Sequence, residues 1–182
     1  MKKAGGNNEI VISRTVSYTG VRKVGLDSCV LYNLIVYVED FDKKRAEIFN
    51  NDNLIFTHQA CLKETKKNLM KYEDYTEEEA RDEVIAYINK KKIGTINADP
   101  TNTKILYDLR EKCRKENIGL HKPDDFIIAD FKKNGINMVY SIDNEFRKAC
   151  EVIGLNAVAF PTYTRELDDK IRNALSKNRY NK

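Results

Sequence analysis

Four acidic residues stand where a parallel α/β fold would gather carboxylates. Asp27 directly follows the apolar VGL of a predicted strand, and Asp143 closely follows MVYS, a second predicted strand. Asp124 lies in the first turn of a predicted helix, and Glu64 lies about one turn into the helix that follows LIF. Because ligands of parallel sheets bind beyond the carboxyl ends of the strands, we expect these four side chains to converge.

A cluster of carboxylates of this kind favours a bound divalent cation. Like charges a few ångströms apart raise one another's pKa values, so the acids cannot all stay ionised without a compensating charge. All-oxygen ligands suit magnesium or manganese better than zinc. Two such ions about 4 Å apart can activate a water and stabilise the leaving oxygen of a phosphodiester. Each acid taken alone has another interpretation, because acids in first turns often cap a helix and favour its dipole.

The elements that must position these acids alternate between strand and helix. Strands are predicted at 23–27, 54–56, 138–141 and 157–160, and helices at 28–38, 42–49, 59–71, 77–90, 100–117, 123–134 and 144–153. Strands separated by helices imply parallel pairing, because each crossover needs a dozen or more residues. We therefore predict an α/β fold, a three-layer α/β/α sandwich with a central, mostly parallel sheet.

Composition excludes several other classes of protein. The 182 residues are 41% hydrophobic, which is enough for the core of one domain. No apolar run approaches the roughly 20 residues of a membrane helix, so we expect no membrane association and a cytoplasmic location. The four cysteines are far apart and form no CxxC pair, so buried, reduced thiols are expected rather than a zinc site.

Three stretches resemble segments of PIN-domain ribonucleases. VGLDSCVLYNLI is similar to the family's opening strand, aspartate and apolar helix. PDDFIIADFKKNGINMVYSIDNEF is similar to its second signature, in which an aspartate begins an apolar helix and a later strand ends in serine or threonine with acids two and four residues on. CLKETKKNL is similar to the segment that carries the family's glutamate. The likeness covers about residues 24–160 and departs at Cys29, where the family commonly has asparagine.

The resemblance implies hydrolysis of single-stranded RNA that leaves a 5′-phosphate, with Mg²⁺ or Mn²⁺ as cofactor. The catalytic residues that it implies are Asp27, Glu64, Asp124 and Asp143, the metal ligands are these four and Glu145, and the supporting residues are Ser28, Ser141 and Asp125. Glu64 would bind the metal directly or through water. Glu145 would be a ligand of a second ion or would merely begin its helix, and the sequence leaves both open.

Asp124 and Asp125 compete for the third acidic position. From Asp124, the positions three and seven residues on are Ile127 and Phe131, which would form one apolar face beneath the ligand. From Asp125 the same steps reach a lysine, which would then point inward. Asp124 is therefore the preferred ligand.

The resemblance also divides the chain into three parts. Residues 1–20 are predicted to be a tail or an extra strand, and residues 21–163 a PIN-like nuclease domain with a helical insertion at about 74–117. Residues 164–182 are predicted to form a C-terminal helix, with apolar residues four apart, and a basic tail.

Partners follow from the charges and from the resemblance. The candidate contacts to RNA phosphates are Lys66, Lys67, Lys90, Lys91 and Lys92, although solvated helix faces would carry the same lysines. Proteins of this kind include toxins of toxin-antitoxin modules, so a toxin inhibited by an antitoxin-like protein is one alternative. A non-catalytic RNA-binding module on the same fold is another. A homodimer is a further expectation, because dimers are common among these proteins.

Overall fold

The computed structural model describes residues 21–37 and 41–161 of the chain. The strand or tail expected at 1–20 and the helix and basic tail expected at 164–182 lie outside the described residues. No helix in the described ranges has the length and apolar character needed to cross a membrane.

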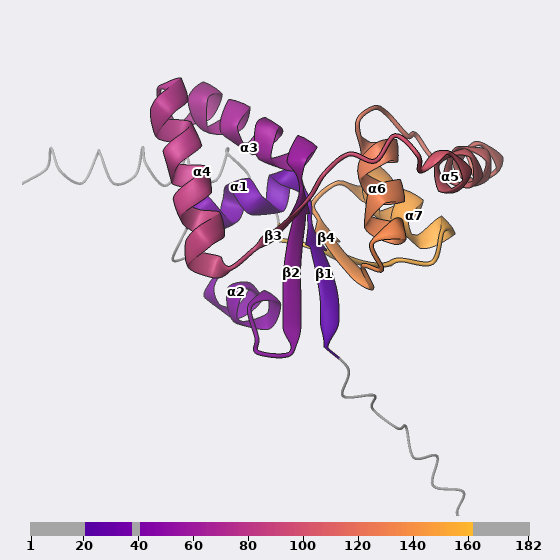
Figure 1. The fold of residues 1–182 in the computed structure, drawn as a ribbon, viewed down its shortest axis with the longest axis horizontal. Helices are drawn as coiled ribbons and strands as arrows, with labels where there is room; N and C mark the ends of the chain where they lie inside the picture. Colours follow the sequence, from indigo (N-terminus) through magenta and orange to yellow (C-terminus); the bar gives the residue numbers. More distant parts are fainter. Residues whose placement is uncertain (1–20, 38–40, 162–182) are drawn as a thin grey trace, which may run out of the picture.

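In the described part of the chain, five parallel strands form one central sheet (Figure 1). They are β1 (Arg22–Leu26), β2 (Asn53–His58), β3 (Gly94–Ile96), β4 (Met138–Ser141) and β5 (Asn156–Ala159), in the spatial order β3-β2-β1-β4-β5. In the register of the sheet, Leu26 of β1 lies opposite Thr57 of β2 and Tyr140 of β4. The carboxyl ends of the three middle strands therefore lie at one edge of the sheet, which is where a parallel fold binds its ligands.

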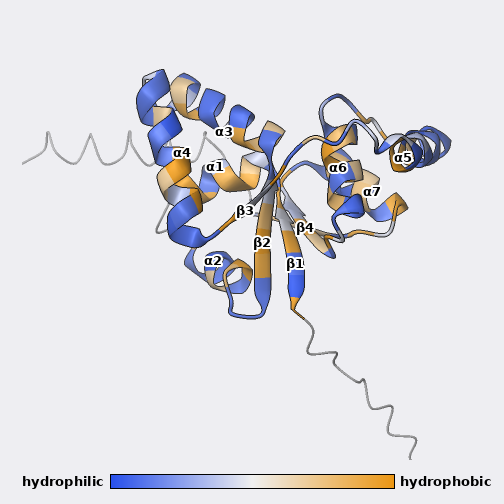
Figure 2. Ribbon diagram, viewed as in Figure 1, coloured by the Kyte–Doolittle hydropathy of each residue, from blue (hydrophilic) through white to orange (hydrophobic). Residues whose placement is uncertain are grey.

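Within residues 21–37 and 41–161, seven helices cover the two faces of the sheet. They are α1 (Ser28–Val36), α2 (Asp42–Ile48), α3 (Gln59–Tyr72), α4 (Glu77–Lys91), α5 (Thr103–Lys115), α6 (Asp124–Lys133) and α7 (Asn144–Val152). Buried residues of α1 to α4 form one apolar cluster with the sheet, and most of the second cluster comes from α5, α6 and α7. In Figure 2, where the ribbon is coloured by hydropathy, hydrophobic residues appear in orange along β1 and β2, between these two groups of helices. The predicted three-layer α/β/α sandwich is confirmed.

The middle strand β1 contributes residues to both hydrophobic clusters, one on each face of the sheet. Val24 and Leu26 are fully buried in the first cluster, whereas Gly25 faces the second. A Cβ atom at Gly25 would lie 3.0 Å from the ring of Phe131, so glycine leaves the room that this ring occupies. A strand buried on both faces reads as an uninterrupted apolar run, which is why VGL was recognisable in the sequence.

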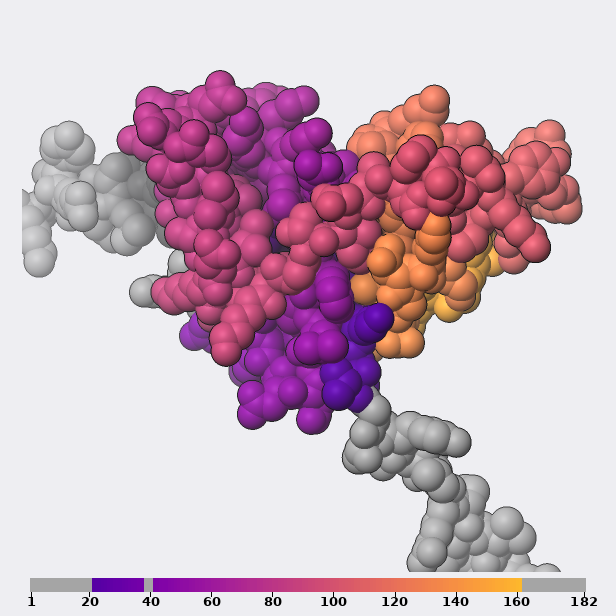
Figure 3. All heavy atoms as spheres, in the orientation of Figure 1, coloured from indigo at the N-terminus to yellow at the C-terminus, as the bar shows by residue number. Residues whose placement is uncertain are grey.

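One strand was not predicted, and several boundaries differ from the sequence prediction. β3 has three residues and was not predicted, because so short a segment carries no periodicity. It pairs with β2, so the segment expected to be a helical insertion also supplies an edge strand of the sheet. β2 extends from Asn53 to His58 rather than over 54–56, and Pro100 lies in a turn before α5. The chain from α4 through β3 to α5 crosses the face shown in Figure 3.

Candidate active site

Asp27 is the most firmly held of the predicted acids. It follows β1, caps the N-terminus of α1, and is 6% exposed. One carboxylate oxygen accepts a hydrogen bond from the Ser28 N–H at 2.7 Å, and the other accepts from Ser141 Oγ at 2.6 Å and Cys29 Sγ at 3.1 Å. An N-cap aspartate satisfies N–H groups that have no partner within the helix, so α1 and the carboxylate fix each other.

Asp143 occupies the equivalent position after the neighbouring strand β4. Its Oδ1 accepts hydrogen bonds from the N–H groups of Glu145 at 2.7 Å and Phe146 at 3.1 Å, which caps α7. Its own N–H donates to Ser141 Oγ at 3.0 Å, and the same hydroxyl donates to Asp27. One serine thus links the ends of β1 and β4 and sets the spacing of the two acids.

Asp124, the first residue of α6, shows that the four acids influence one another. Burial raises its pKa, and the charges of Asp27, Asp143 and Glu64, with that of Asp125, raise it further, to about 6. Glu64 lies exposed on α3. The four acids that the sequence singled out therefore come from α3, α6 and the ends of β1 and β4 to a shared region of negative charge.

The donors in this region suit a hard cation. Within the described ranges, no group of three His, Cys, Asp or Glu side chains lies close enough to hold a metal ion as the side chains stand. Magnesium usually keeps several waters and takes one or two carboxylates directly, so it does not require such a group. The carboxylates offer oxygen ligands, and a bound cation would offset the burial and the neighbouring negative charges that raise the pKa of Asp124. These residues fit Mg²⁺ or Mn²⁺.

Comparison with known proteins identifies the fold. No family model matches the sequence, and no curated protein matches it. Solved structures do match: VapBC2 from Rickettsia felis, bound to a DNA fragment from its promoter, is 13% identical, with a TM-score of 0.61 over 76% of this chain and 99% of that chain. VapBC-1 from nontypeable Haemophilus influenzae is 8% identical, with a TM-score of 0.58 over 75% and 97%. VapC20 from Mycobacterium tuberculosis, a toxin that cleaves the sarcin-ricin loop, is 16% identical, with a TM-score of 0.53 over 69% and 94%. These are PIN-domain toxin structures.

This chain has the PIN-domain fold. At such low identities the likeness establishes the arrangement of the elements and not the chemistry of the site. The roles of the residues in this PIN domain therefore have to be argued from their own contacts.

Two acids of the predicted set have other partners in this structure. Asp125 is 4% exposed and forms an ion pair with Arg110 of α5, whose Nε donates to its Oδ2 at 2.8 Å. Glu145 accepts from the Gly119 N–H at 3.0 Å and from Lys148 Nζ at 2.7 Å, and these bonds lower its pKa. Asp125 and Glu145 each pair with a positively charged side chain. No ion pair of Asp124 occurs within the described ranges.

The predicted RNA-binding lysines do not form one surface. Lys66 forms an ion pair with Glu77 at 2.8 Å, and no ion pair of Lys67 occurs within the described ranges. Lys90, Lys91 and Lys92 lie at the end of α4 and line a pocket with the amino-terminal half of β2. That half of the strand is at the opposite end of the sheet from Asp27, so these three lysines are remote from the acids.

Sequence reasoning did not assign roles to two thiols beside Asp27. Cys29 Sγ donates to Asp27 and accepts from the Ile142 N–H at 3.3 Å, and Cys61 Sγ lies 4.0 Å from the other Asp27 oxygen. Burial, followed by the charge of Asp27, raises the pKa of both thiols, which keeps them neutral and able to donate. Cys29 thus donates a hydrogen bond to Asp27 from the position where PIN domains commonly have asparagine. A cysteine at this position did not suggest such a bond from the sequence alone.

A buried charge network beneath the site was also missed. Asp130 is 2% exposed and accepts hydrogen bonds from Asn102 Nδ2 at 3.0 Å and the Asp99 N–H at 3.2 Å. His58 Nε2 lies 3.2 Å from the same carboxylate, and His58 Nδ1 accepts from the Ala60 N–H at 3.1 Å, which places the ring proton on Nε2. Burial lowers the pKa of His58. The network fixes α6 against the start of α3 and therefore helps to position Asp124 and Glu64.

Proposed function

We propose that the protein is a metal-dependent endoribonuclease that hydrolyses phosphodiester bonds of single-stranded RNA. The observation that carries the proposal is the position of Asp27 and Asp143 after the adjacent strands β1 and β4, where Ser141 bonds to both. The pKa of Asp124 is raised by burial and then by the charges of these two acids, Glu64 and Asp125. A fold maintained for RNA binding alone would have no reason to bring like charges together beside a polyanion. The likeness to a toxin that cleaves the sarcin-ricin loop supports an RNA substrate.

Each acid has a separate part in the proposed reaction. Asp27, Asp124 and Asp143 would hold Mg²⁺ or Mn²⁺ directly, and Glu64 directly or through water. A bound cation supplies a water of lowered pKa and stabilises charge on the phosphate and the leaving oxygen. Ser28 and Ser141 orient the Asp27 carboxylate, and Ser141 also fixes the backbone of Asp143. Protonation of Asp124 below about pH 6 would weaken cation binding, so activity should fall as the pH drops through that value.

Cleavage of an end-labelled single-stranded RNA, with Mn²⁺, with Mg²⁺ and with EDTA, tests this proposal. Asp143→Asn keeps an oxygen for the helix cap and removes the charge, so we expect a loss of cleavage of about 100-fold or more while the fold is retained. Asp108→Asn, on the exposed side of α5, is the matched control. Cleavage that persists in EDTA, or that Asp143→Asn leaves intact, would refute the assignment. Binding of RNA with no cleavage under any condition would favour the non-catalytic module.

A toxin of a toxin-antitoxin module is the second candidate. The structures most relevant to this chain include VapBC complexes, two of them bound to DNA. In this role the protein would act on RNA in the cytoplasm and be inhibited by an antitoxin-like partner. Expression of the parent should then arrest growth and expression of Asp143→Asn should not, and the product of a neighbouring gene should restore growth and co-purify with the protein. Light scattering of the purified chain would test the expected homodimer.

A further inference from the structure

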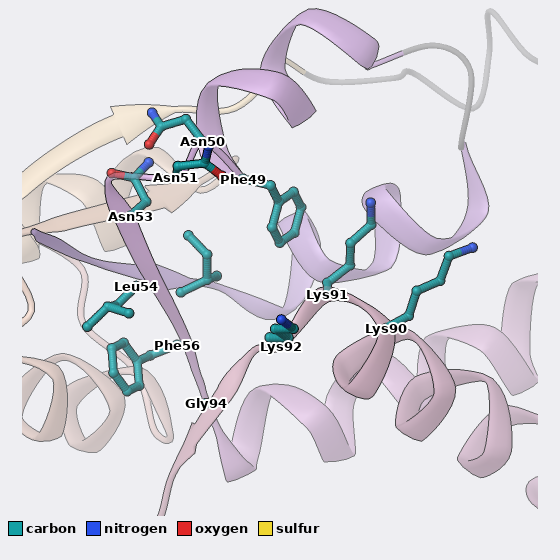
Figure 4. Close-up of a pocket in the computed structure, with 11 residues that line it drawn as sticks. Phe49, Asn50, Asn51, Asn53, Leu54, Phe56, Lys90, Lys91, Lys92 and Gly94 are labelled. Carbon is teal, nitrogen blue, oxygen red and sulfur yellow. The ribbon is translucent and has the colours of Figure 1, made fainter.

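A pocket lies at the end of the sheet opposite the acids. Its volume is about 510 Å³. Figure 4 shows the residues that line it. The lining comes from the turn after α2, from β2, from the end of α4 and from β3, and consists of Phe49, Asn50, Asn51, Asn53, Leu54, Ile55, Phe56, Lys90, Lys91, Lys92 and Gly94. Leu26, the residue before Asp27, pairs with Thr57, three residues after Leu54. The β2 residues of the lining precede Thr57 by one to four residues, so at about 3.3 Å per residue they lie roughly 3–13 Å along the strand from the level of Leu26.

The charge of this pocket is positive and uncompensated. Its lining contains three lysines and no carboxylate. Within the described ranges, Lys90 and Lys92 have no ion pair, and Lys91 Nζ lies 5.2 Å from the centre of the Phe49 ring. The side chains of Asn50 and Asn53 donate to backbone carbonyls at the end of α2, whereas the Asn51 amide forms no such bond in the described part of the chain. The pocket thus offers cations and one uncommitted amide to a ligand.

Lys92 occupies a backbone conformation that costs stability. It is the C-cap of α4 with φ of 54°, in the left-handed region where glycine or asparagine is preferred. Glycine is present two residues later, at Gly94, where a Cβ atom would lie 2.7 Å from the Phe56 ring. Backbone strain retained at a specific side chain is a reason to look for a function of that side chain.

We propose that this pocket is a second RNA-binding site, which takes a phosphate on Lys90 and Lys92 and a base against the apolar lining. Lysine binds phosphate as a point charge, whereas recognition of carboxylates favours the planar fork of arginine, which the lining lacks. Leu54 is 49% exposed and lies in the lining with Phe56, so a base has apolar surface to cover. The inference rests on the proposed function: an RNA held at both ends of the sheet must be longer than the few nucleotides that the acids contact.

Binding measured in EDTA tests the second site without the metal or the reaction. The probes are end-labelled single-stranded RNAs of about 12 and about 4 nucleotides, with ATP as the free nucleotide and a poly-glutamate peptide as the acidic protein segment. The variant combines Lys90→Ala, Lys91→Ala and Lys92→Gly, and the matched control combines Lys104→Ala, Lys112→Ala and Lys115→Ala on α5. Glycine at position 92 should keep or raise the melting temperature, so a loss of binding cannot come from unfolding.

We expect the variant to bind the longer RNA about tenfold more weakly than the parent. Its slope of log affinity against log salt should be shallower by about 0.7 to 1.4 between about 50 and 200 mM salt, since each single-strand phosphate contact of Lys90 and Lys92 contributes about 0.7. An unchanged slope, or an equal loss in the α5 control, would overturn the proposal. So would binding of ATP or poly-glutamate that is tighter than that of the RNA and lost in the same variant. Cleavage of the shorter RNA with Mn²⁺ should be the same in variant and parent; its absence from both would refute the proposed nuclease and leave the second site standing.

Discussion

Replacement of Asp124 by asparagine should stabilise the metal-free protein at neutral pH. The rise of its pKa from 3.8 to about 6 means that the folded state holds a proton that the unfolded state has released. At about 1.4 kcal/mol per pKa unit, the ionised side chain costs the folded state at most about 3 kcal/mol above pH 6. Solvent around this half-buried group screens part of the repulsion, and asparagine loses about 0.3–1 kcal/mol of favourable interaction with the N-terminus of α6. We expect a net gain of about 1–2 kcal/mol.

The difference in stability between the parent and the Asp124→Asn variant should depend on pH. The parent should lose stability through Asp124 as the pH rises from 3.8 to about 6, so the gain in the Asp124→Asn variant should appear over that interval and remain constant above it. Urea unfolding in EDTA at several pH values gives the difference between the two proteins. His58, whose pKa is lowered by burial, destabilises both proteins in acid and cancels in the difference.

Added Mg²⁺ or Mn²⁺ should then stabilise the parent more than the Asp124→Asn variant, because binding to the folded state adds to its stability by mass action. Asp108→Asn is the control: its carboxylate lies on the surface of α5, 3.1 Å from Lys112, and its loss should matter little at any pH. If Asp124→Asn proved less stable than the parent at pH 8, or if the difference did not vary with pH, Asp124 would not lie among uncompensated charges. The proposed active site would then lose one of its supports.

Three other substitutions examine the surroundings of the site. Arg110→Ala removes the partner of the buried Asp125 and should destabilise the fold by about 2–4 kcal/mol in urea unfolding; a change below about 0.5 kcal/mol would show that the pair is not needed. Gly25→Ala places a Cβ atom 3.0 Å from Phe131 and should cost about 1–3 kcal/mol in the same assay, and a neutral effect would mean that the ring has room to move. Glu145→Gln should keep most of the RNA cleavage activity, because Lys148 and Gly119 already engage its carboxylate; a loss as large as that of Asp143→Asn would instead make it a metal ligand.

The parts of the fold that the sequence revealed are those with a local signal. VGL before Asp27 is an apolar run because β1 is buried on both faces, and Thr76 with Glu79 forms the capping box that begins α4. MVYS matched β4 at both ends. In each case the residues that define the element are neighbours in the sequence, so their types alone predict it.

The parts that the sequence did not reveal depend on contacts between distant segments. Ser141 and Asp27 are 114 residues apart, and nothing near either residue shows that one hydroxyl bonds the carboxylate and the Asp143 N–H together. The three residues of β3 are a strand because β2 supplies their partners. Asp130 lies in an amphipathic helix like any surface acid, and only the fold shows it buried against His58.

The two interpretations of the acids, helix caps and metal ligands, turn out to be compatible. Asp143 uses one oxygen, Oδ1, for both N–H groups at the start of α7, and no group in the described ranges bonds its other oxygen. The cap holds the carboxylate at a fixed angle beyond β4 and leaves Oδ2 available to a cation. Asp27 is held in the same way beyond β1, by α1 and by Ser141. A helix that follows a parallel strand needs an acceptor at its N-terminus, and the same position faces the ligand edge of the sheet, so capping supplies preoriented carboxylates to that edge. A loss of stability on substitution of Asp27 or Asp143 therefore does not argue against a catalytic role. The capping role and the catalytic role can be separated by measuring cleavage in a variant that keeps the helix cap and loses the negative charge.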